Sequence, residues 1–216
     1  AGGTASGCSL SDTSTSGVLT ATSSGTCLII ATKGSDNSYN SATSSAATFT
    51  FSRASQTISI SSLGTSSASY PYSQALSAST SGSSGTGAIT YAISSGGTAS
   101  GCALSNSTAT ATLTSTTSGT CLIAATIAQD TNYDTATSTS ATFTFSKASQ
   151  ATLTISLVTS SKTYPYSQAP TFSTSGGNGT GPVSYSVSAG GTASGCSLSD
   201  TSTSGVLTAT TSGTCL

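Results

Sequence analysis

The chain contains 216 residues, of which only 4% are charged, and His, Met, Trp and Glu are absent. Four Lys and Arg residues stand against five Asp, so the chain lacks the basic surface that nucleic-acid binding requires. The usual general acid–base catalysts are nearly missing, so we expect no enzyme, no catalytic residues and no cofactor. No apolar stretch approaches the roughly 20 residues that cross a bilayer, and we expect no membrane span.

Ser and Thr together account for 96 residues, and the apolar fraction is 34%. Disordered segments usually combine high net charge with few aromatic and β-branched residues, whereas this chain is almost uncharged. Thr is itself β-branched, and it occurs with Val, Ile, Tyr and Phe in alternating segments. The composition therefore predicts an all-β protein with a polar but uncharged exterior.

The chain is a tandem repeat with a period of 94 residues. The segments GGTASGC and GTCL each occur three times at this interval, and YPYSQ and TFTFS each occur twice. The period is too long for a solenoid repeat of about 20 to 50 residues. It matches the size of a small β-sandwich domain, about 100 residues, so we expect each repeat to have its own core.

A second period is present inside the first. Residues 2–56 match the residues 94 positions on at 34 of 55 positions, whereas residues 1–28 match residues 189–216 at 27 of 28. Alternate copies are therefore more alike than neighbours. We infer an alternating array with a 188-residue unit, and we expect the array to be longer than this sequence.

The repeat boundaries predict three regions. The first segment, residues 1–53, is the C-terminal part of a repeat, the middle repeat spans 54–147, and the third segment, 148–216, is the N-terminal part of another. Two explanations stay open. The favoured one is a window on a longer polymer. In the other, the leading half of the next chain completes the terminal half of this one, as in strand-donation assemblies.

Turn residues and period-two alternation predict seven short strands in the middle repeat. In chain order they are Thr57–Ser62, Ala75–Thr80, Ala88–Ser94, Cys102–Leu104, Ala109–Ser115, Thr120–Ile127 and Ala141–Ser146. Alternation places Ile89, Tyr91 and Ile93 on one face, and Phe143 and Phe145 on another. Strands spaced about every 10 residues predict an all-β fold of tandem immunoglobulin-like β-sandwich domains.

The cysteines fall into three pairs, each with 18 intervening residues: Cys8 and Cys27, Cys102 and Cys121, and Cys196 and Cys215. One pair per repeat predicts one disulfide per repeat and an oxidising compartment. Closing a loop of about 20 residues contributes roughly 3 kcal/mol in the chain-entropy model. A metal site is the weaker alternative, because two thiolates without His cannot complete a tetrahedral shell. A redox-active pair is also weaker, because no nearby cation lowers a thiol pKa.

Asp36 and Asp130 occupy equivalent positions, and each precedes a Tyr by three residues, Tyr39 and Tyr133. We interpret both as Asx-turns with the Tyr packed over the end of the sandwich. A calcium loop is the alternative. It needs six or more oxygen ligands, and these loops offer one or two carboxylates, so we expect no metal site.

Two sequons, at Asn106 and Asn178, lie in predicted loops and are candidate N-glycosylation sites. O-linked glycans on the many hydroxyls are an equal alternative, because sugars would replace the charge-based solubility that this surface lacks.

The YPYSQ segments place two tyrosines close together. Paired rings offer flat apolar faces on which a sugar can stack, whereas the alternative is a rigid turn whose Tyr covers the edge of the core. The candidate glycan contacts are Tyr70, Tyr72, Tyr164 and Tyr166.

The repeated motifs carry a resemblance to a known family. They are GTCLIAAT (119–126), DTNYDTATS (130–138), TFTFSKASQ (142–150), YPYSQ (164–168) and GTGPVSY (179–185). In these motifs the chain resembles the bacterial immunoglobulin-like repeats of very large secreted or cell-surface proteins. The resemblance implies an extracellular or cell-surface location, adhesion, surface-layer, stalk or fibre roles, and no catalytic residues.

Repetition without a chemical site favours a structural role, an extracellular filament or stalk of serial domains whose partners are copies of itself or neighbouring repeats. Its linkers, Ser52–Gln56 and Ser146–Gln150, are short enough to stiffen the array. The alternative function is an adhesin-type binding module that recognises glycans or another cell surface. Its expected sites are the Gly-rich loops Gly82–Gly87 and Gly176–Gly181, together with the YPY tyrosines.

Overall fold

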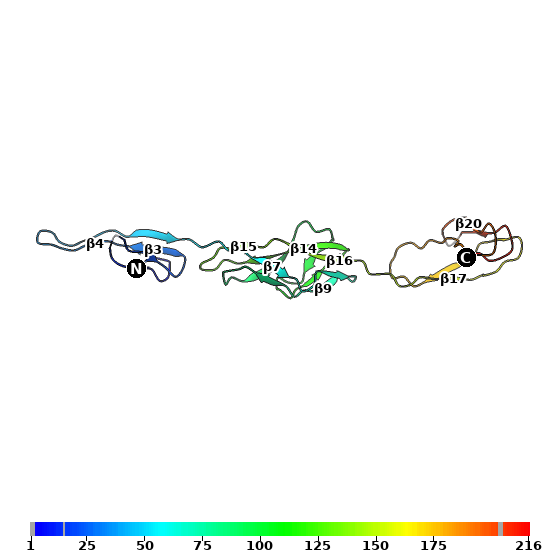
Figure 1. Cartoon of the computed structure of the whole chain (residues 1–216), viewed down its shortest axis with the longest axis horizontal. Helices are drawn as coiled ribbons and strands as arrows, with labels where there is room; N and C mark the ends of the chain where they lie inside the picture. The colour runs from blue at the N-terminus through cyan, green and yellow to red at the C-terminus, as the bar shows by residue number, and fades with distance from the viewer. Residues whose placement is uncertain (1–2, 15, 203–204) are drawn as a thin grey trace. The chain divides into compact units, whose positions relative to one another are not determined.

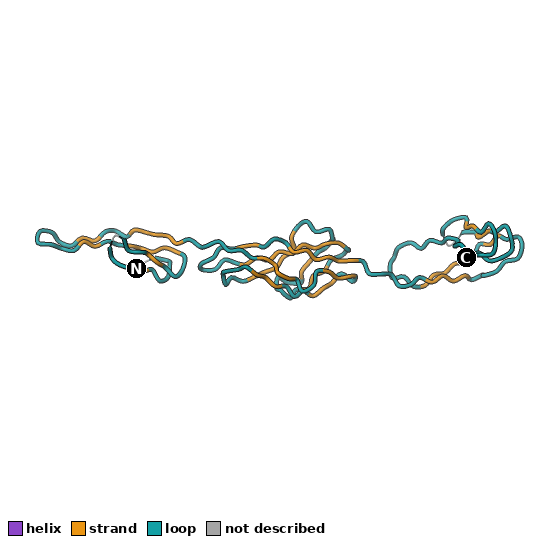
Figure 2. The backbone as a smooth tube through the Cα atoms, viewed as in Figure 1, coloured by secondary structure: helices purple, strands orange, loops and turns teal. Residues whose placement is uncertain are grey.

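The computed structural model describes residues 3–14, 16–202 and 205–216. These residues form strands, turns and loops and no helix, which confirms the all-β prediction (Figure 2). The described residues accordingly contain no helix long and apolar enough to span a membrane. The chain divides into two compact units, Ala1–Ala148 and Ser149–Leu216. The predicted repeat boundaries after residues 53 and 147 stay predictions.

The described residues of the first segment form three antiparallel strand pairs. Its longest pair joins β3 (Gly25–Ile29) to β6 (Ala47–Phe51) over five residue pairs. The other pairs join β1 (Ser9–Leu10) to β2 (Leu19–Thr20), and β4 (Thr32–Lys33) to β5 (Ala42–Thr43).

One layer of the middle repeat is built around its longest strand, β14 (Gly119–Ile127). The strand order is β11 (Ile89–Ser94), β14, β16 (Ala141–Ser146) and β8 (Ser67–Ser69), with β15 (Ala136–Thr137) also paired to β14. Figure 1 labels β14, β15 and β16 of this layer. The strands β11 and β16 run antiparallel to β14, whereas β8 runs parallel to β16. The sequence patterns did not predict β8 and β15, which are only three and two residues long.

The other layer contains β7 (Ser59–Ser62), β9 (Ser73–Ala75), β10 (Ser79–Ser81), β12 (Ala103–Leu104) and β13 (Thr112–Thr114). The strand predicted over Ala75–Thr80 is divided into β9, which pairs with β13, and β10, which pairs with β7. Backbone bonds bridge the gap, from Leu76 N–H to the Ala111 carbonyl at 3.0 Å and from Ala78 N–H to that of Ala109 at 2.8 Å. These bonds join the short strands into one layer.

The core lies between the two layers. Alternate residues of β14 are buried, and on β16 both Phe143 (0% exposed) and Phe145 (1%) are buried, as the alternation predicts. On β11, Tyr91 is buried, and Ile89 and Ile93 on the same face are half-buried. The opposite layer contributes Leu63, Leu76 and Leu113. Two layers that enclose one core fit a β-sandwich.

The recurring GGTASGC and GTCL motifs form one local structure. Thr98 and Thr120 each donate the backbone N–H to the other's Oγ1, at 3.1 and 2.9 Å. Gly119 has φ +137°, and a Cβ on it would lie 2.6 Å from the Ala99 nitrogen, so only glycine fits this approach. The pairs Thr4 with Thr26 and Thr192 with Thr214 make the same reciprocal bonds.

The six cysteines form the disulfides that their spacing predicts, Cys8–Cys27, Cys102–Cys121 and Cys196–Cys215, each with a Cα–Cα distance of 5.8 Å. In the middle repeat the bond ties the loop before β12 to β14, where Cys121 is fully buried. A crosslink at the start of a central strand restricts the unfolded chain and holds the motif against the core.

In the second unit, the residues that the structure describes form two small sheets. The strand β17 (Thr154–Leu157) pairs with β19 (Phe172–Ser175), and β21 (Leu207–Thr208) lies between β18 (Ser167–Gln168) and β20 (Ser197–Leu198). Among the described residues outside the middle repeat, the buried apolar side chains are those of Cys27, Pro170 and Tyr185. The middle repeat therefore holds almost all of the core.

We predict that Phe143→Ala lowers the free energy of unfolding of the middle repeat by about 3 to 5 kcal/mol, because it leaves a cavity between the layers. Tyr70→Ala removes a ring that is 64% exposed, so we expect a loss below about 1 kcal/mol. Denaturant unfolding followed by circular dichroism measures both. Equal losses would contradict this placement of the core.

Candidate functional site

The first segment meets the middle repeat at a hydrogen-bonded contact, here called the first junction. It comprises Ser24, Arg53–Gln56, Gly85–Thr86 and Gln129–Asp134. The backbone of Ala54 donates to the Asn132 carbonyl at 2.8 Å and accepts from the Asp134 N–H at 2.9 Å. Ala54 and Tyr133 thereby form a parallel bridge. The linker between β6 and β7 is thus held by two backbone bonds to the loop that follows β14.

Arg53 adds side-chain bonds to the same loop. Its Nε donates to the Asp130 carbonyl at 2.9 Å, and one terminal nitrogen donates to Gln129 Oε1 at 3.3 Å. A planar guanidinium supports two directed bonds at once, whereas an ammonium acts as a point charge. Lys147, at the equivalent position one period on, therefore cannot reproduce this pair of directed hydrogen bonds.

Ser24 connects the first segment to the loop from another side. Its backbone N–H donates to Asn132 Oδ1 at 3.1 Å, and its hydroxyl donates to the Thr131 carbonyl. Ser24 lies more than 100 residues before its partners and belongs to no motif shared with them. Sequence patterns therefore did not identify this contact.

Gln56 fixes the end of the linker. Its Nε2 donates to the Asp134 carbonyl at 2.6 Å, and its Oε1 accepts the Gly85 N–H at 2.9 Å. Gln150, one period on, accepts the N–H groups of Asn178 and Gly179 at 2.7 and 3.0 Å. The Gly-rich loops, predicted as adhesin sites, thus use backbone donors to hold the linker glutamine.

The Asx-turn interpretation of Asp130 and Asp36 is confirmed by their hydrogen bonds. Asp130 Oδ1 accepts the N–H groups of Asn132 and Tyr133, both at 2.8 Å. Asp36 Oδ1 accepts the corresponding N–H groups of Ser38 and Tyr39 at 2.7 and 2.9 Å. The expected packing of the tyrosine is wrong for the first segment, because Tyr39 is 77% exposed.

The second oxygen of Asp130 binds the Gly-rich loop. Its Oδ2 accepts the Thr86 N–H at 2.6 Å and the Thr86 hydroxyl at 3.2 Å. These hydrogen bonds lower the pKa of Asp130 from 3.8 to about 2. The backbone N–H of Thr86 contributes most, and those of Asn132 and Tyr133 add to it. The ionised carboxylate thus joins two loops at the first junction. No group of three or more His, Cys, Asp or Glu within the described ranges is placed to hold a metal ion.

The YPY tyrosines divide into an outer and an inner ring. Tyr70 is 64% exposed and Tyr164 is 81% exposed. Tyr72 is half-buried and packs against Phe145 with ring centroids 5.8 Å apart. Tyr72 therefore covers the core edge, as in the rigid-turn interpretation. Tyr70 faces solvent, where a sugar could stack on it. Tyr166 is likewise half-buried, beside Tyr164 at 5.6 Å.

Both sequon asparagines are exposed. Asn106 Oδ1 accepts the N–H and hydroxyl of Thr108 at 2.8 and 2.6 Å, which closes an Asx-turn. In the flanking segments Asp12 and Asp200 accept N–H groups two residues on, both at 2.7 Å. Asn106 therefore has a turn-forming role whether or not a glycan is attached.

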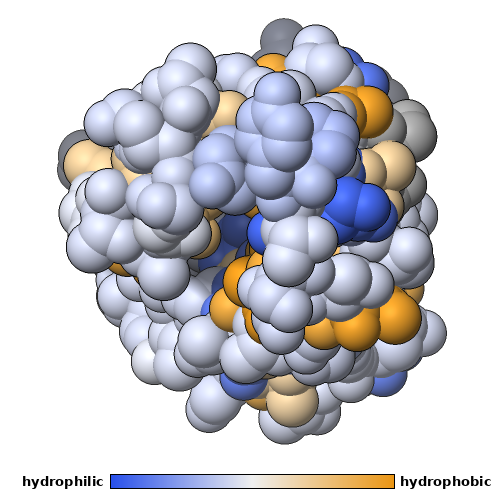
Figure 3. All heavy atoms as spheres, turned by 90° about the vertical axis from the view of Figure 1, so that its right-hand side faces the viewer, coloured by the Kyte–Doolittle hydropathy of each residue, from blue (hydrophilic) through white to orange (hydrophobic). Residues whose placement is uncertain are grey.

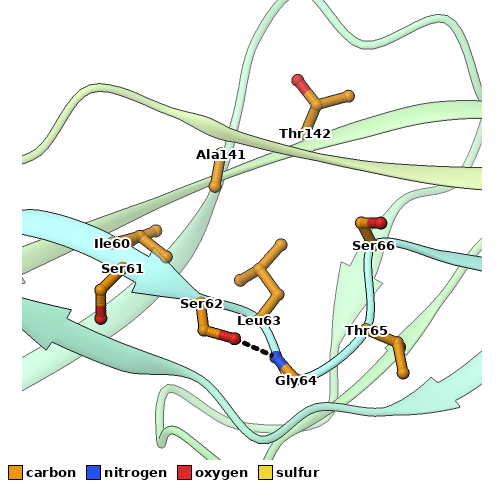
Figure 4. Close-up of a pocket in the computed structure, with 9 residues that line it drawn as sticks. All are labelled: Ile60, Ser61, Ser62, Leu63, Gly64, Thr65, Ser66, Ala141 and Thr142. Atoms are coloured by element: carbon orange, nitrogen blue, oxygen red, sulfur yellow. Dashed lines mark hydrogen bonds between the residues drawn. The ribbon is translucent and has the colours of Figure 1, made fainter.

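The hollow in Figure 4 lies where the chain passes from β7 to β8. Its volume is 330 Å³, and its lining consists of hydroxyl, methyl and backbone groups from Ile60–Ser66, Ala141 and Thr142. Ser62 Oγ accepts the Gly64 N–H at 2.9 Å. No lining side chain is ionisable near neutral pH, so this hollow has no acid, base or nucleophile–base pair. Most of the surface drawn in Figure 3 is of intermediate hydropathy (pale), with smaller hydrophilic (blue) and hydrophobic (orange) areas.

Comparisons with protein-family models, curated proteins and solved structures find no match.

We predict that Asp130 makes stability at the first junction depend on pH. The folded-state pKa near 2 lies below the unfolded value of about 3.9. The carboxylate therefore contributes its full stabilisation above about pH 4, and loses it as the pH falls towards about 2. Thermal unfolding of the wild type and of Asp130→Asn between these pH values measures the stabilisation that the carboxylate contributes. The difference in stability between them should shrink as the pH falls, and a constant difference would contradict the assignment.

Proposed function

We propose that the chain is a non-catalytic structural component of an extracellular filament, stalk or surface fibre built from serial immunoglobulin-like domains. The first junction carries this proposal. A linker of a few residues is held there by backbone bonds to Ala54, side-chain bonds from Arg53 and Gln56, and a separate contact through Ser24. These contacts restrict rotation about the linker, and a load-bearing array needs such restriction.

The strand order supports the immunoglobulin-like part of the proposal. In one layer the order is β7, then β10 and β9 together as one interrupted strand, then β13 and β12. In the other layer the order is β11, β14 and β16. This is the order A, B, E, D opposite C, F, G of an immunoglobulin sandwich, with β8 added beside the last strand. The resemblance of the repeated motifs to bacterial immunoglobulin-like repeats points the same way.

The disulfides support the extracellular part. Three disulfides account for all six cysteines, which fits an oxidising environment. An uncharged surface rich in hydroxyl groups suits attached glycans, for which Asn106 and Asn178 are the candidate N-linked sites.

We predict that Arg53→Ala loosens the first junction. The amide N–H groups of Ala54 and Asp134 should exchange with solvent about tenfold faster, because the loop loses the bonds that hold it to the linker. Arg53→Lys should give a smaller increase, since it keeps the charge without the fork. Lys147→Ala, which removes the equivalent cation, serves as the control and should leave both amides unchanged. Exchange rates that stay at wild-type values in Arg53→Ala would argue against a clamped linker.

Electron microscopy of the native protein tests the function itself. We expect threads or stalks of serial domains, and isolated globular particles would rule the proposal out.

A second candidate function is an adhesin-type binding module. The exposed rings of Tyr70 and Tyr164 favour it, since a flat ring open to solvent can stack on a sugar. A glycan array in which Tyr70→Ala and Tyr164→Ala abolish a hit supports this function, and an array without hits excludes it.

A further inference from the structure

The loop of the first junction, residues 129–134, has a counterpart in the first segment, residues 35–40, one period earlier. In each loop the aspartate N–H donates to the carbonyl of the tyrosine three residues on, at 3.0 Å. The Oδ1 of each aspartate also accepts the same two N–H groups. The two loops therefore share this turn, although only the aspartate and the tyrosine are common to their sequences.

Two of the residues that differ between the loops bind the first segment with their side chains. Gln129 Oε1 accepts a hydrogen bond from the Arg53 guanidinium at 3.3 Å, and Asn132 Oδ1 accepts the Ser24 N–H at 3.1 Å. Both Gln129 and Asn132 are exposed, so burial in the middle repeat does not hold them in place. Their side-chain bonds cross the junction, whereas the turn itself depends on the aspartate and on backbone groups.

The other two differing residues contribute backbone groups to the junction. Thr131 accepts the Ser24 hydroxyl with its carbonyl, and Asp134 bonds to the linker with its N–H and its carbonyl. Their counterparts are Asn37 and Asn40, and asparagine supplies the same backbone groups. The differences that matter to the junction are therefore the two in which a side chain crosses it.

Serine cannot replace either of the two side-chain acceptors. In the counterpart loop Ser35 stands in place of Gln129, and Ser38 stands in place of Asn132. A serine hydroxyl is bonded directly to Cβ, whereas the amide oxygens of Gln and Asn lie further along the side chain. From the same backbone position the hydroxyl ends further from the donor, and the hydrogen bond across the junction is lost.

The cation that faces the loop changes together with these acceptors. Arg53 donates from two nitrogens, one to the Asp130 carbonyl and one to Gln129. The residue one period on is Lys147, whose ammonium acts as a point charge and does not form such a directed pair. The cation that makes two directed bonds thus precedes the loop that offers two acceptors.

We propose that Gln129 and Asn132 are the residues by which the middle repeat recognises the end of an Arg53-bearing repeat. The first junction is then held more firmly than a junction of the reverse order, in which lysine faces a loop with serines. The inference rests on the proposed filament. In an alternating filament, stiff pairs of repeats would be separated by looser joints.

Hydrogen exchange of the 216-residue chain tests the proposal, with the amides of Ala54 and Asp134 as reporters. Gln129→Ser should speed their exchange about threefold, and Asn132→Ser by a similar factor, because each removes one hydrogen bond across the junction. The triple variant Arg53→Lys, Gln129→Ser, Asn132→Ser recreates the reverse order. Its reporter amides should exchange at least about tenfold faster than those of the wild type.

A double-mutant cycle separates recognition from general loosening. Arg53→Lys should speed exchange in the wild-type loop, but it should add almost nothing in the Gln129→Ser background, where the second bond of the guanidinium is already lost. Thr131→Asn is the matched control, because it introduces a residue of the other loop and keeps the carbonyl that Ser24 uses. It should leave both reporter amides unchanged.

The counterpart loop shows that serines at these positions are compatible with the turn. The amide of Phe143 in β16 reports on the core, and it should stay protected in every variant. Faster exchange at the reporter amides then measures the junction itself.

Reporter amides that exchange at wild-type rates in Gln129→Ser and Asn132→Ser overturn the proposal. Effects of Arg53→Lys and Gln129→Ser that simply multiply also overturn it, because the two residues would then act independently. The proposed filament would survive either result if Arg53→Ala still loosens the linker and the native protein forms threads.

Discussion

Burial of two phenylalanines between two sheet layers is the interaction on which this structure depends. The chain has few large apolar side chains, so Phe143 and Phe145 of β16 close most of the space between the layers of the middle repeat. Where β16 is present, leucines from the opposite layer become buried. In the second unit no described strand takes its place, and the corresponding side chains line an open groove. The two phenylalanines of β16 therefore hold the layers of the middle repeat together.

The first junction shows how a nearly uncharged chain connects its repeats. Most of its bonds run between backbone groups, amides and hydroxyls. The Arg53 guanidinium donates to neutral oxygens, and the Asp130 carboxylate accepts from neutral N–H and hydroxyl groups. Salt screens long-range charge attraction, whereas short neutral hydrogen bonds depend little on it. Such a junction should therefore depend little on ionic strength. The same bonds engage the Gly-rich loop, so its backbone donors serve the linker.

Alternation between similar repeats gives the two linkers different chemistry. Arg53 binds its loop through two nitrogens, whereas the equivalent residue at the second linker is Lys147, with a single-point ammonium. Both linkers keep a glutamine, Gln56 or Gln150, that accepts N–H groups from the following Gly-rich loop. The glutamine contact is therefore common to both linkers, and the cation distinguishes them.

The sequence alone determined the period, the disulfide pairing, the all-β class, the buried face of β16 and the Asx-turns. These features follow from local spacing, because side-chain direction alternates along a strand and a short loop limits which cysteines can meet. Only the tertiary structure decided the parallel pairing of β8, the division of Ala75–Thr80 into two strands, and the exposure of Tyr70 beside half-buried Tyr72. It alone paired Ser24 with Asn132. Such contacts depend on how distant segments pack together, and a chain in which nearly half the residues are Ser or Thr offers many equivalent hydroxyls from which no local pattern can choose.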